Sequence, residues 1–286
     1  MELGIEGRVA LVMAASRGIG RGIATALARE GARVGIASRT RERIEAAAGE
    51  ITAQAAEQAA EQATTEAGSR VTAEAAAASR SEDGETAAEV RPFVADTDDL
   101  ERLAQLPGEV AEALGPIDVL VLNSGGPPFG GALDQDLDEW NTAYRSLVLA
   151  PRVLAGAVVP GMRERGWGRI VNVGSTSTRE PIPSLNLSNA HRMAANGFLK
   201  TLATEVAADG VTVNTVATGL FATDRLADAS GSLAGAEAGA REDVPAARLG
   251  RPEEYGDLVA FLSSERAAYL TGAVIPLDGG ALRSTF

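Results

Sequence analysis

Two glycines near the start of the chain, Gly18 and Gly20, have the spacing and the flanking residues of a phosphate-binding turn. An uncharged apolar run at residues 9–13 precedes them, and apolar residues follow at helical spacing. Glycine lets the backbone approach a phosphate where a Cβ would clash, and a helix N-terminus offers free N–H groups and a positive dipole end. This order of strand, glycine turn and helix favours a dinucleotide site over a tight turn without a ligand.

The residues that follow the next apolar run, 33–37, bear on which dinucleotide would bind. A carboxylate there would hydrogen-bond the adenosine ribose, whereas an arginine accommodates a 2′-phosphate. This chain has Ser38 followed by Arg39, with Arg17 in the glycine turn. The pattern favours NADP(H) over NAD(H); the alternative is that Arg39 and Arg41 simply begin a solvated helix.

Alternating short apolar runs and helical patterns must position these groups, and they predict an α/β fold. We expect one Rossmann-type doubly wound domain over residues 1–286, with a parallel sheet of about seven strands and helices on both faces. Strands are expected at residues 9–13, 33–37, 90–95, 118–122, 169–174, 211–216 and 273–277, and helices at residues 140–162, 188–208 and 255–262. The helix from residue 140 should end near Pro160. Ligand crevices lie outside the carboxyl ends of such strands, so Asp96 is a candidate for contact with the adenine.

Two segments depart from this alternation. Residues 41–88 are rich in Ala, Glu and Gln, and a narrow stripe of Ile44, Ala48, Ile51 and Ala55 predicts a helix that continues past residue 58. We interpret residues 52–88 as an Ala/Glu-rich surface insertion, broken by glycine at positions 68 and 84, with a second short helix at residues 71–79. Residues 221–247, rich in Ala, Gly, Ser and Asp, are typical of a mobile lid.

The composition argues against several classes of site and partner. The chain has no cysteine and a single histidine, His191, so we expect no disulfide, no thiol nucleophile and no metal centre. A formal net charge of −13 argues against a nucleic-acid partner, which needs a basic face. The sequence lacks the run of about 18 apolar residues that would indicate a membrane span. It also lacks the basic region followed by an apolar core that would indicate a secretory signal. We therefore expect a cytoplasmic protein.

Four stretches in the same order resemble motifs of the short-chain dehydrogenase/reductase family. They are the glycine turn at residues 15–20, residues 122–125 after the fourth strand, residues 168–175, and residues 269–280. The 3-oxoacyl-acyl-carrier-protein reductases are the branch that the chain most resembles. The resemblance implies an NADP(H)-dependent oxidoreductase of a small-molecule carbonyl or alcohol, 3-oxoacyl-type substrates included, that assembles as a homotetramer or homodimer.

The resemblance and the ends of the expected strands together imply a set of cofactor-binding residues. They are Ala14, Ser16, Arg17, Gly18, Ile19, Gly20, Ser38, Arg39, Asp96, Thr97, Asn123, Ser124, Gly125, Arg192, Gly219 and Thr223. The family's usual Thr-Gly before the turn is replaced here by Met13 and Ala14.

The family's catalytic residues are an asparagine, a serine, a tyrosine and, four positions after the tyrosine, a lysine. By resemblance, Ser175 matches the serine, while Ser188, Arg192 and Leu147 stand at the tyrosine, lysine and asparagine positions. Reduction of a carbonyl leaves an alkoxide that needs a proton, and a serine hydroxyl is a far weaker acid than a phenol with a pKa of about 10. Ser188 and Arg192, at i and i+4, share one helix face, and the arginine can still bind ribose hydroxyls.

Two other side chains could replace the missing acid. Histidine titrates near neutrality, and His191 lies close to Ser188 in sequence, while Tyr144 lies one helical turn before Leu147. Each has an alternative role in helix packing or at an interface. The sequence therefore leaves two functions open: an oxidoreductase with an atypical proton path, or a catalytically impaired dinucleotide-binding sensor or partner subunit.

Overall fold

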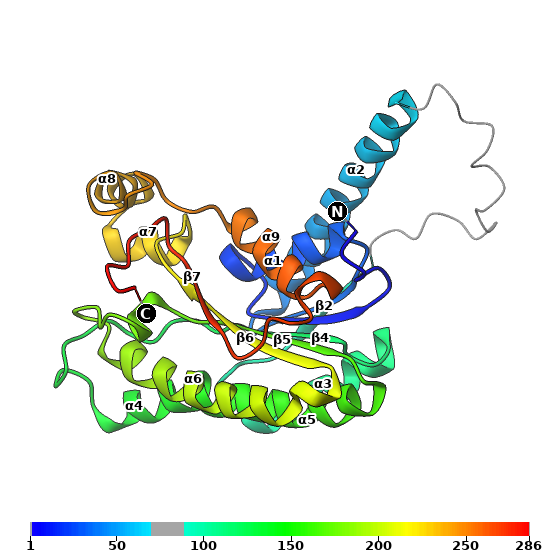
Figure 1. Ribbon diagram of the computed structural model, residues 1–286. Coiled ribbons are helices and arrows are strands. Elements are labelled where there is room, and N and C mark those ends of the chain that lie inside the picture. The colour runs from blue at the N-terminus through cyan, green and yellow to red at the C-terminus, as the bar shows by residue number, and fades with distance from the viewer. Residues whose placement is uncertain (1, 70–88, 286) are drawn as a thin grey trace.

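The computed structural model describes residues 2–69 and 89–285, and it places seven parallel strands in one sheet (Figure 1). The strands lie in the order β3-β2-β1-β4-β5-β6-β7. Their bounds are β1 (Val9–Met13), β2 (Arg33–Ser38), β3 (Val90–Val94), β4 (Val119–Leu122), β5 (Gly168–Val173), β6 (Val211–Thr218) and β7 (Val274–Leu277). The predicted α/β fold with a parallel sheet is therefore confirmed.

Helices cover both faces of the sheet (Figure 1). One face carries α1 (Gly18–Arg29), α2 (Arg41–Ser69) and α9 (Pro252–Leu262), and the other carries α3 (Leu100–Leu114), α4 (Leu137–Tyr144), α5 (Ala150–Arg165) and α6 (Asn186–Val206). Helices α7 (Asp224–Ser230) and α8 (Leu233–Asp243) pack on each other in a smaller cluster. The chain also forms a π-helical turn, η1 (Arg145–Leu149), and the 3₁₀ turns η2 (Thr176–Thr178), η3 (Ala207–Asp209) and η4 (Glu265–Ala267).

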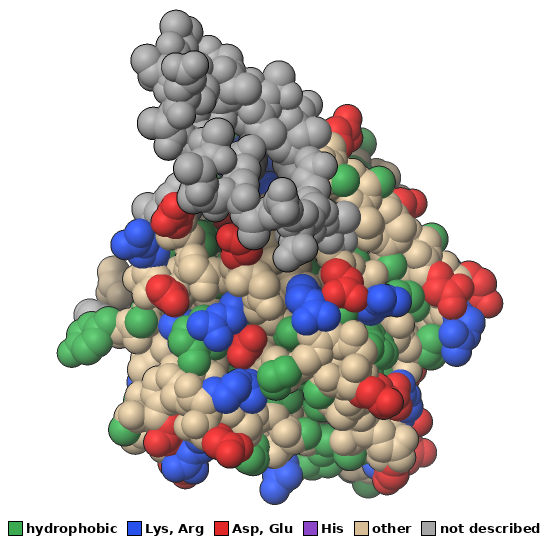
Figure 2. Space-filling view, turned by 90° about the vertical axis from the view of Figure 1, so that its right-hand side faces the viewer, with side chains coloured by type: hydrophobic (Ala, Val, Ile, Leu, Met, Phe, Trp, Pro, Cys, Tyr) green, Lys and Arg blue, Asp and Glu red, His purple; other side chains and the backbone are tan. Residues whose placement is uncertain are grey.

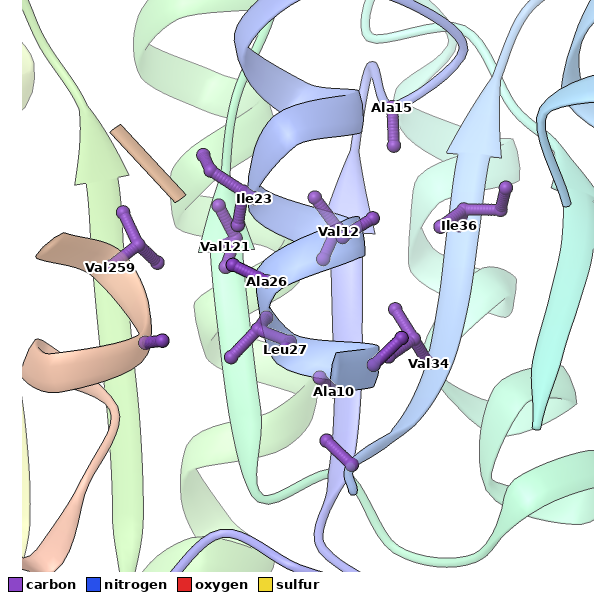
Figure 3. Close-up of a cluster of buried hydrophobic side chains, with 14 of the residues drawn as sticks. Ala10, Val12, Ala15, Ile23, Ala26, Leu27, Val34, Ile36, Val121 and Val259 are labelled. Atoms are coloured by element: carbon purple, nitrogen blue, oxygen red, sulfur yellow. The ribbon is translucent and has the colours of Figure 1, made fainter. Parts of the chain in front are cut away.

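Helix α1 and strands β1, β2 and β4 form the core beneath the glycine turn (Figure 3). Ile23 and Leu27 of α1 belong to one buried cluster with Val12 of β1 and Val34 of β2, and none of these side chains is exposed. Alternate residues of β1, such as Leu11, belong to the core on the other face of the sheet. Burial on both faces explains why β1 contains only apolar residues, and each of its valine, leucine and methionine side chains stabilises the fold by about 1.5–3 kcal/mol. This packing fixes the end of β1 against the start of α1.

The long helix predicted over residues 140–162 differs from the structure at both ends. It begins earlier, at the start of α4, and passes through η1 into α5. The prediction that it ends near Pro160 is wrong, because α5 continues to Arg165. A proline removes only one backbone donor, and the buried side chains of Val159 and Met162 hold this turn against the sheet. Gly166, with a φ of +66°, ends the helix in the left-handed conformation.

Helix α2 begins in the core and then extends away from the sheet (Figure 1). The predicted stripe of Ile44, Ala48, Ile51 and Ala55 is buried, and the helix continues past residue 58 to Ser69 without a break at residue 68. The insertion therefore starts later than residue 52, because Ala55 still belongs to the core. The second short helix expected at residues 71–79 and the glycine at position 84 lie outside the described residues.

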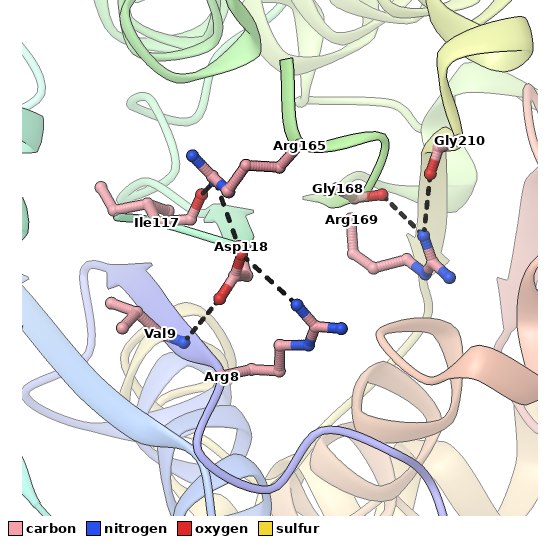
Figure 4. Close-up of polar contacts among 8 residues, drawn as sticks. All are labelled: Arg8, Val9, Ile117, Asp118, Arg165, Gly168, Arg169 and Gly210. Atoms are coloured by element: carbon pink, nitrogen blue, oxygen red, sulfur yellow. Dashed lines mark hydrogen bonds and ion pairs between the residues drawn. The ribbon is translucent and has the colours of Figure 1, made fainter. Parts of the chain in front are cut away.

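Asp118 joins three parts of the chain at the amino ends of the strands, opposite the expected ligand crevice (Figure 4). Its carboxylate accepts a hydrogen bond from Val9 N–H at 3.2 Å. It also lies 3.8 Å from Arg8 Nη1 and 3.5 Å from Arg165 Nη2. These contacts fasten β1, the start of β4 and the end of α5 to one another. Since these contacts lie at the edge of the sheet away from the crevice, we infer that they stabilise the fold and do not take part in ligand binding.

Three observations bear on the partners that the composition argues against. By length and composition, the helical stretch Leu137–Arg165 could cross a membrane, but it packs on α3 and α6 as core helices do. Acidic and basic side chains are interspersed on the face shown in Figure 2. Within residues 2–69 and 89–285, no three His, Cys, Asp or Glu side chains cluster as metal ligands would. The expected absence of membrane, nucleic-acid and metal partners stays a prediction.

Candidate active site

A groove of about 530 Å³ lies at the carboxyl ends of the strands, between the loops after β1, β2, β3 and β4 and the start of α7. All the expected cofactor-binding residues except Arg192 and Gly219 line it. The lining residues from that set are Ala14, Ser16, Arg17, Gly18, Ile19, Gly20, Ser38, Arg39, Asp96, Thr97, Asn123, Ser124, Gly125 and Thr223. The parallel sheet therefore gathers segments that are far apart in the sequence at one edge, where such folds bind their ligands.

The glycine turn presents its backbone to the groove because no side chain stands in the way. Gly18 has a φ of +55°, a conformation that favours glycine. A Cβ at Gly20 would meet the carbonyl oxygen of Ala14 and would lie 2.8 Å from Asn123 Nδ2. Asn123 Nδ2 donates to that same carbonyl at 3.4 Å, which joins the loop after β4 to the turn. Ala14 itself has a φ of +48°, a left-handed conformation that strains a residue with a Cβ.

The end of the groove beside β2 contains polar groups that fit a phosphate. Ser38 Oγ is buried and has no hydrogen-bond partner among the described residues. Arg39 and Arg43 line the groove, are exposed, and form no ion pair in the described part of the chain. Sequence reasoning misses Arg43, although its spacing of four residues from Arg39, at the start of a predicted helix, is a signal for it.

Two carboxyl groups after β3, Asp96 and Asp98, line the same end of the groove. Asp96 Oδ1 accepts a hydrogen bond from Asp98 N–H at 3.2 Å. Asp98 Oδ1 is buried, with no hydrogen-bond partner in the described part of the chain. Burial, reinforced by the charge of Asp96, raises the pKa of Asp98. Asp98 is therefore a further candidate for contact with the adenosine, beyond the predicted Asp96.

Arg17 and Asp224 form an ion pair that joins the glycine turn to α7. Arg17 Nη1 lies 2.8 Å from Asp224 Oδ2, and the two side chains are 55% and 65% exposed. Thr223, just before, caps α7 by accepting from Leu226 N–H. The region predicted as a lid, residues 221–247, thus contains two helices, of which α7 contributes to the groove. Arg17 lines the groove with its charge already partnered, so its expected role at the adenosine phosphate stays a prediction.

Arg192 lies at a small cavity of about 20 Å³ next to the groove. The two share the lining residues Thr97, Asn123, Ser124 and Ser146. Arg192 Nε donates to Ser188 Oγ at 3.1 Å, and Arg192 Nη1 donates to the carbonyl oxygen of Val173 at 2.6 Å. Burial lowers the pKa of Arg192 to about 10. Ser188 and Arg192 therefore do share one helix face, and they lie at the carboxyl end of β5.

The remaining expected site residues do not line the groove. Ser175 follows β5, and its Oγ accepts a hydrogen bond from Ser177 N–H at 3.1 Å. Neither Ser175 nor Ser188 lines the groove or the small cavity. Leu147 is buried in η1 and lines the small cavity beside Arg192. Gly219 lies outside both linings, where a Cβ would come within 2.6 Å of Asp278 Cα.

The two alternative acids, His191 and Tyr144, line neither cavity. His191 is buried, and its Nδ1 lies 2.7 Å from the carbonyl oxygen of Leu187. Its ring centroid lies 4.9 Å from that of Trp140 and 6.2 Å from that of Tyr144. This aromatic packing between α4 and α6 favours the packing alternative for both residues.

Sequence reasoning also misses the wall formed by Arg225 and residues 126–129. Arg225 Nη1 donates to the carbonyl oxygen of Gly126 at 2.9 Å, and Arg225 Nη2 donates to that of Pro127 at 2.9 Å. The guanidinium lies 5.0 Å from the ring centroid of Phe129. Glycines directly after β4 are a signal for close packing at this loop. Nothing in the sequence points to Arg225, which is 99 residues from Gly126.

Comparison with known proteins identifies the family of the chain. It matches the family model described as enoyl-(acyl carrier protein) reductase over residues 46–281 and the short chain dehydrogenase model over residues 8–78. The chain belongs to the short-chain dehydrogenase/reductase family. The resemblance predicted from the glycine turn and the later motifs is therefore confirmed.

This short-chain dehydrogenase/reductase has relatives that align along nearly its whole length. It is 33% identical over 280 residues to a 3-oxoacyl-[acyl-carrier-protein] reductase from Vibrio harveyi, which covers 97% of this chain and 98% of that protein. It matches the structure of L-sorbose reductase from Gluconobacter frateurii, complexed with NADPH and L-sorbose, with a TM-score of 0.84, 29% identity and coverage of 99% and 100%. It matches a 3-oxoacyl (acyl-carrier-protein) reductase from Agrobacterium tumefaciens C58, with NADP bound, with a TM-score of 0.81, 27% identity and coverage of 98% and 96%.

Proposed function

We propose that this chain is an NADP(H)-dependent oxidoreductase that interconverts a small-molecule carbonyl compound and its alcohol. The observation that carries the proposal is the buried Ser38 Oγ, which has no partner among the described residues and lies in a groove also lined by Arg39 and Arg43. A hydroxyl and two guanidinium groups suit a 2′-phosphate, whereas an NAD(H) site places a carboxylate here. The NADPH and NADP of the solved relatives support the same cofactor.

The residues of the groove fit a dinucleotide along its length. The backbone of residues 15–20 and the N-terminus of α1 would hold the pyrophosphate, and Arg192 would bind ribose hydroxyls at the other end. When bound, the cofactor supplies a hydride to the carbonyl carbon or accepts one from the alcohol.

In this proposal Ser188 donates the proton that the substrate oxygen needs after hydride transfer, and Arg192 assists by its charge. Because Arg192 Nε donates to Ser188 Oγ, the hydroxyl hydrogen of Ser188 is not used in that contact. Ser188 is buried and lines neither cavity, so a substrate oxygen would have to enter beside Arg192 to receive that hydrogen. A neighbouring cation favours the ionised form of an acid, which offsets part of the weakness of an aliphatic hydroxyl. Ser175 would orient the substrate oxygen from the end of β5. We therefore expect slower proton transfer than a phenol would give.

The names of the relatives point to 3-oxoacyl thioesters and keto sugars as candidate substrates. Assembly as a homotetramer or homodimer and a location in the cytoplasm complete the proposal. The test is NADPH oxidation by the purified protein with ketones, keto sugars and 3-oxoacyl thioesters, at low and at molar salt. We expect turnover with at least one of these classes and a lower rate when NADH replaces NADPH.

One observation favours the second function. Among the residues that the structure describes, no tyrosine lines the groove or the small cavity. A dinucleotide-binding sensor or partner subunit would bind one NADPH per chain in a calorimetric titration and would oxidise none of it with the whole panel. That pair of results would replace the oxidoreductase proposal.

A further inference from the structure

Two arginines near the proposed reaction centre, Arg192 and Arg225, have no acidic partner within 4.0 Å in the described part of the chain. Each is held by backbone carbonyl oxygens instead, Arg192 by Val173 and Arg225 by Gly126 and Pro127. A carbonyl oxygen fixes the direction of a guanidinium but leaves its positive charge uncompensated. Both charges therefore remain available to a ligand.

The protein makes room for Arg225 at the wall of the groove. A Cβ at Gly126 would meet the guanidinium carbon of Arg225, so glycine at 126 is what allows the arginine to lie there. The ring of Phe129 packs against the same guanidinium at 5.0 Å. The residue as a whole is exposed and lines the groove. Arg225 is thus positioned on the surface of the groove and does not point freely into solvent.

Arg192 lines the small cavity and Arg225 lines the groove, and these two spaces adjoin because they share four lining residues. Burial and, more weakly, the charge of Arg225 lower the pKa of Arg192 to about 10. Like charges without a counter-ion repel each other, and an anion bound near both of them lowers this cost. Asp228 also lines the groove but forms no ion pair with Arg225 in the described structure, and Asp224 is paired with Arg17.

The topology separates this positive region from the one that suits the 2′-phosphate. Arg39 and Arg43 follow β2, whereas Arg225 follows β6, and β1, β4 and β5 lie between those strands in the sheet. A dinucleotide that places its 2′-phosphate beside β2 has one such phosphate only. The 2′-phosphate therefore cannot also be the partner of Arg225, which leaves the cofactor pyrophosphate or an anion on the substrate.

We propose that Arg225 binds a carboxylate on the substrate, assisted by the positive charge of Arg192 in the adjoining cavity, so that the chain selects oxo acids and hydroxy acids over neutral carbonyl compounds. This inference rests on the proposed oxidoreductase function. Arginine is suited to this role because its planar fork binds a carboxylate with two parallel hydrogen bonds. Arg225 is the specificity-determining residue of the pair, since Arg192 also contacts Ser188.

The experiment compares oxo acids with their methyl esters, which keep the carbon skeleton and remove the charge. For a series of chain lengths, kcat/KM is measured with NADPH, and binding of the same compounds is measured by calorimetry with saturating NADP⁺. We expect the wild type to prefer the acids at least tenfold in both measurements. Arg225→Gln should weaken the acids about 10- to 100-fold and change the esters less than threefold. Arg225→Lys should restore part of the preference.

Matched variants separate this effect from general damage. Arg241→Gln removes an exposed arginine of α8 that lines neither cavity and should change neither ratio. Gly126→Ala should displace the guanidinium and reproduce the loss seen in Arg225→Gln, which keeps the test available if that variant does not fold. Thermal unfolding and NADPH affinity are recorded for every variant, and both should stay close to the wild type.

Three outcomes would overturn the inference. Equal use and equal binding of acids and esters by the wild type would show that no carboxylate is selected, while turnover of the esters would leave the proposed function intact. A loss of NADPH affinity in Arg225→Gln at an unchanged acid-to-ester ratio would assign Arg225 to the cofactor pyrophosphate. Absence of binding by either compound would also refute it. Arginine-dependent binding of acids without any turnover would instead refute the proposed oxidoreductase function alone.

Discussion

Arg192 Nε lies 3.1 Å from Ser188 Oγ, one turn earlier on α6, so the guanidinium lies against the residue that we predict to stand at the tyrosine position of the family. The two residues are therefore linked in space as well as in sequence. A larger side chain at 188 would displace Arg192 from Ser188 and from the carbonyl oxygen of Val173. Changing one of the two residues alone would disturb the other.

The triple variant Ser188→Tyr, Arg192→Lys and Leu147→Asn should raise carbonyl reductase activity above that of the native chain. It restores a phenol of suitable acidity, an ammonium beside it, and an amide in η1, where Leu147 faces the same small cavity as Arg192. Ser188→Tyr alone should lose activity. Initial rates of NADPH oxidation compare the variants. Robust native turnover that survives Ser188→Ala would contradict both the rescue argument and the proposed role of Ser188.

The native chain should bind NADP(H) more tightly than NAD(H). Replacing Ser38 by Asp and Arg39 by Gln should weaken NADP(H) about 10- to 100-fold and strengthen NAD(H), because the carboxylate repels the phosphate and suits a free ribose. Arg43→Gln should weaken NADP(H) further. Calorimetric titration of both dinucleotides measures this. Arg41→Gln is the matched control, since Arg41 pairs with Glu45 and does not line the groove. Tighter binding of NAD(H) by the native chain would show the assignment to be wrong.

Ala14→Gly should stabilise the protein. A left-handed conformation destabilises a folded residue that has a Cβ by roughly 1–2 kcal/mol, and glycine removes this strain. Glycine also gives the unfolded chain more conformational freedom, which offsets about 0.4–1 kcal/mol of the gain. We expect the free energy of unfolding in urea to rise by about 0.5–1 kcal/mol. Ala111→Gly, on the exposed side of α3, should instead lower it by about 1 kcal/mol. A destabilised Ala14→Gly would mean that the strain at φ +48° is absent in solution.

Acid should weaken the attachment of α9 through Glu254. The Arg248 guanidinium, followed by Arg251 N–H, lowers the pKa of Glu254 to about 2, below its ordinary value of 4.5. A depressed carboxyl pKa stabilises the fold above pH 4.5, and this contribution disappears as the pH falls from 4.5 to about 2. Glu254→Gln should lower the thermal midpoint by about 1–2 °C at pH 7, in low salt, and by nothing near pH 2. Glu253→Gln, at an exposed neighbour, should have no such pH-dependent effect. A difference that persists at pH 2 would show that charge is not the cause.

The sequence predicts the sheet and most of the groove because both follow from backbone pattern. A strand made only of apolar residues, such as β1, must be buried on both of its faces. The role of the glycines at 18 and 20 follows from the residues next to them and can be recognised without a structure. Contacts between distant segments carry no such local signal. The bonds of Arg225 to Gly126 and the packing of His191 on Trp140 therefore appear only in the structure.

Sequence reasoning is also weakest where packing overrides a local rule. Pro160 is a helix breaker by its chemistry, yet α5 continues through it because the flanking side chains are buried. The stripe of α2 likewise predicts a helix correctly but does not show how far the core extends along it, and the burial of Ala55 shows that the core reaches at least that residue. Periodicity predicts which face of a helix is buried. The neighbouring elements that cover that face decide how long the buried part of the helix is.

Gly126 and Arg225 occupy adjoining space although 99 residues separate them, and this restricts how the chain can diverge. A side chain at 126 would displace the guanidinium from its present place, so a mutation at either position changes the wall that the other helps to form. In an alignment of descendants of this sequence, glycine at 126 should be kept wherever arginine is kept at 225, and bulkier residues should enter only after the arginine is lost. Covariation of positions 126 and 225 would then identify, from their sequences alone, the chains that have this wall of the groove.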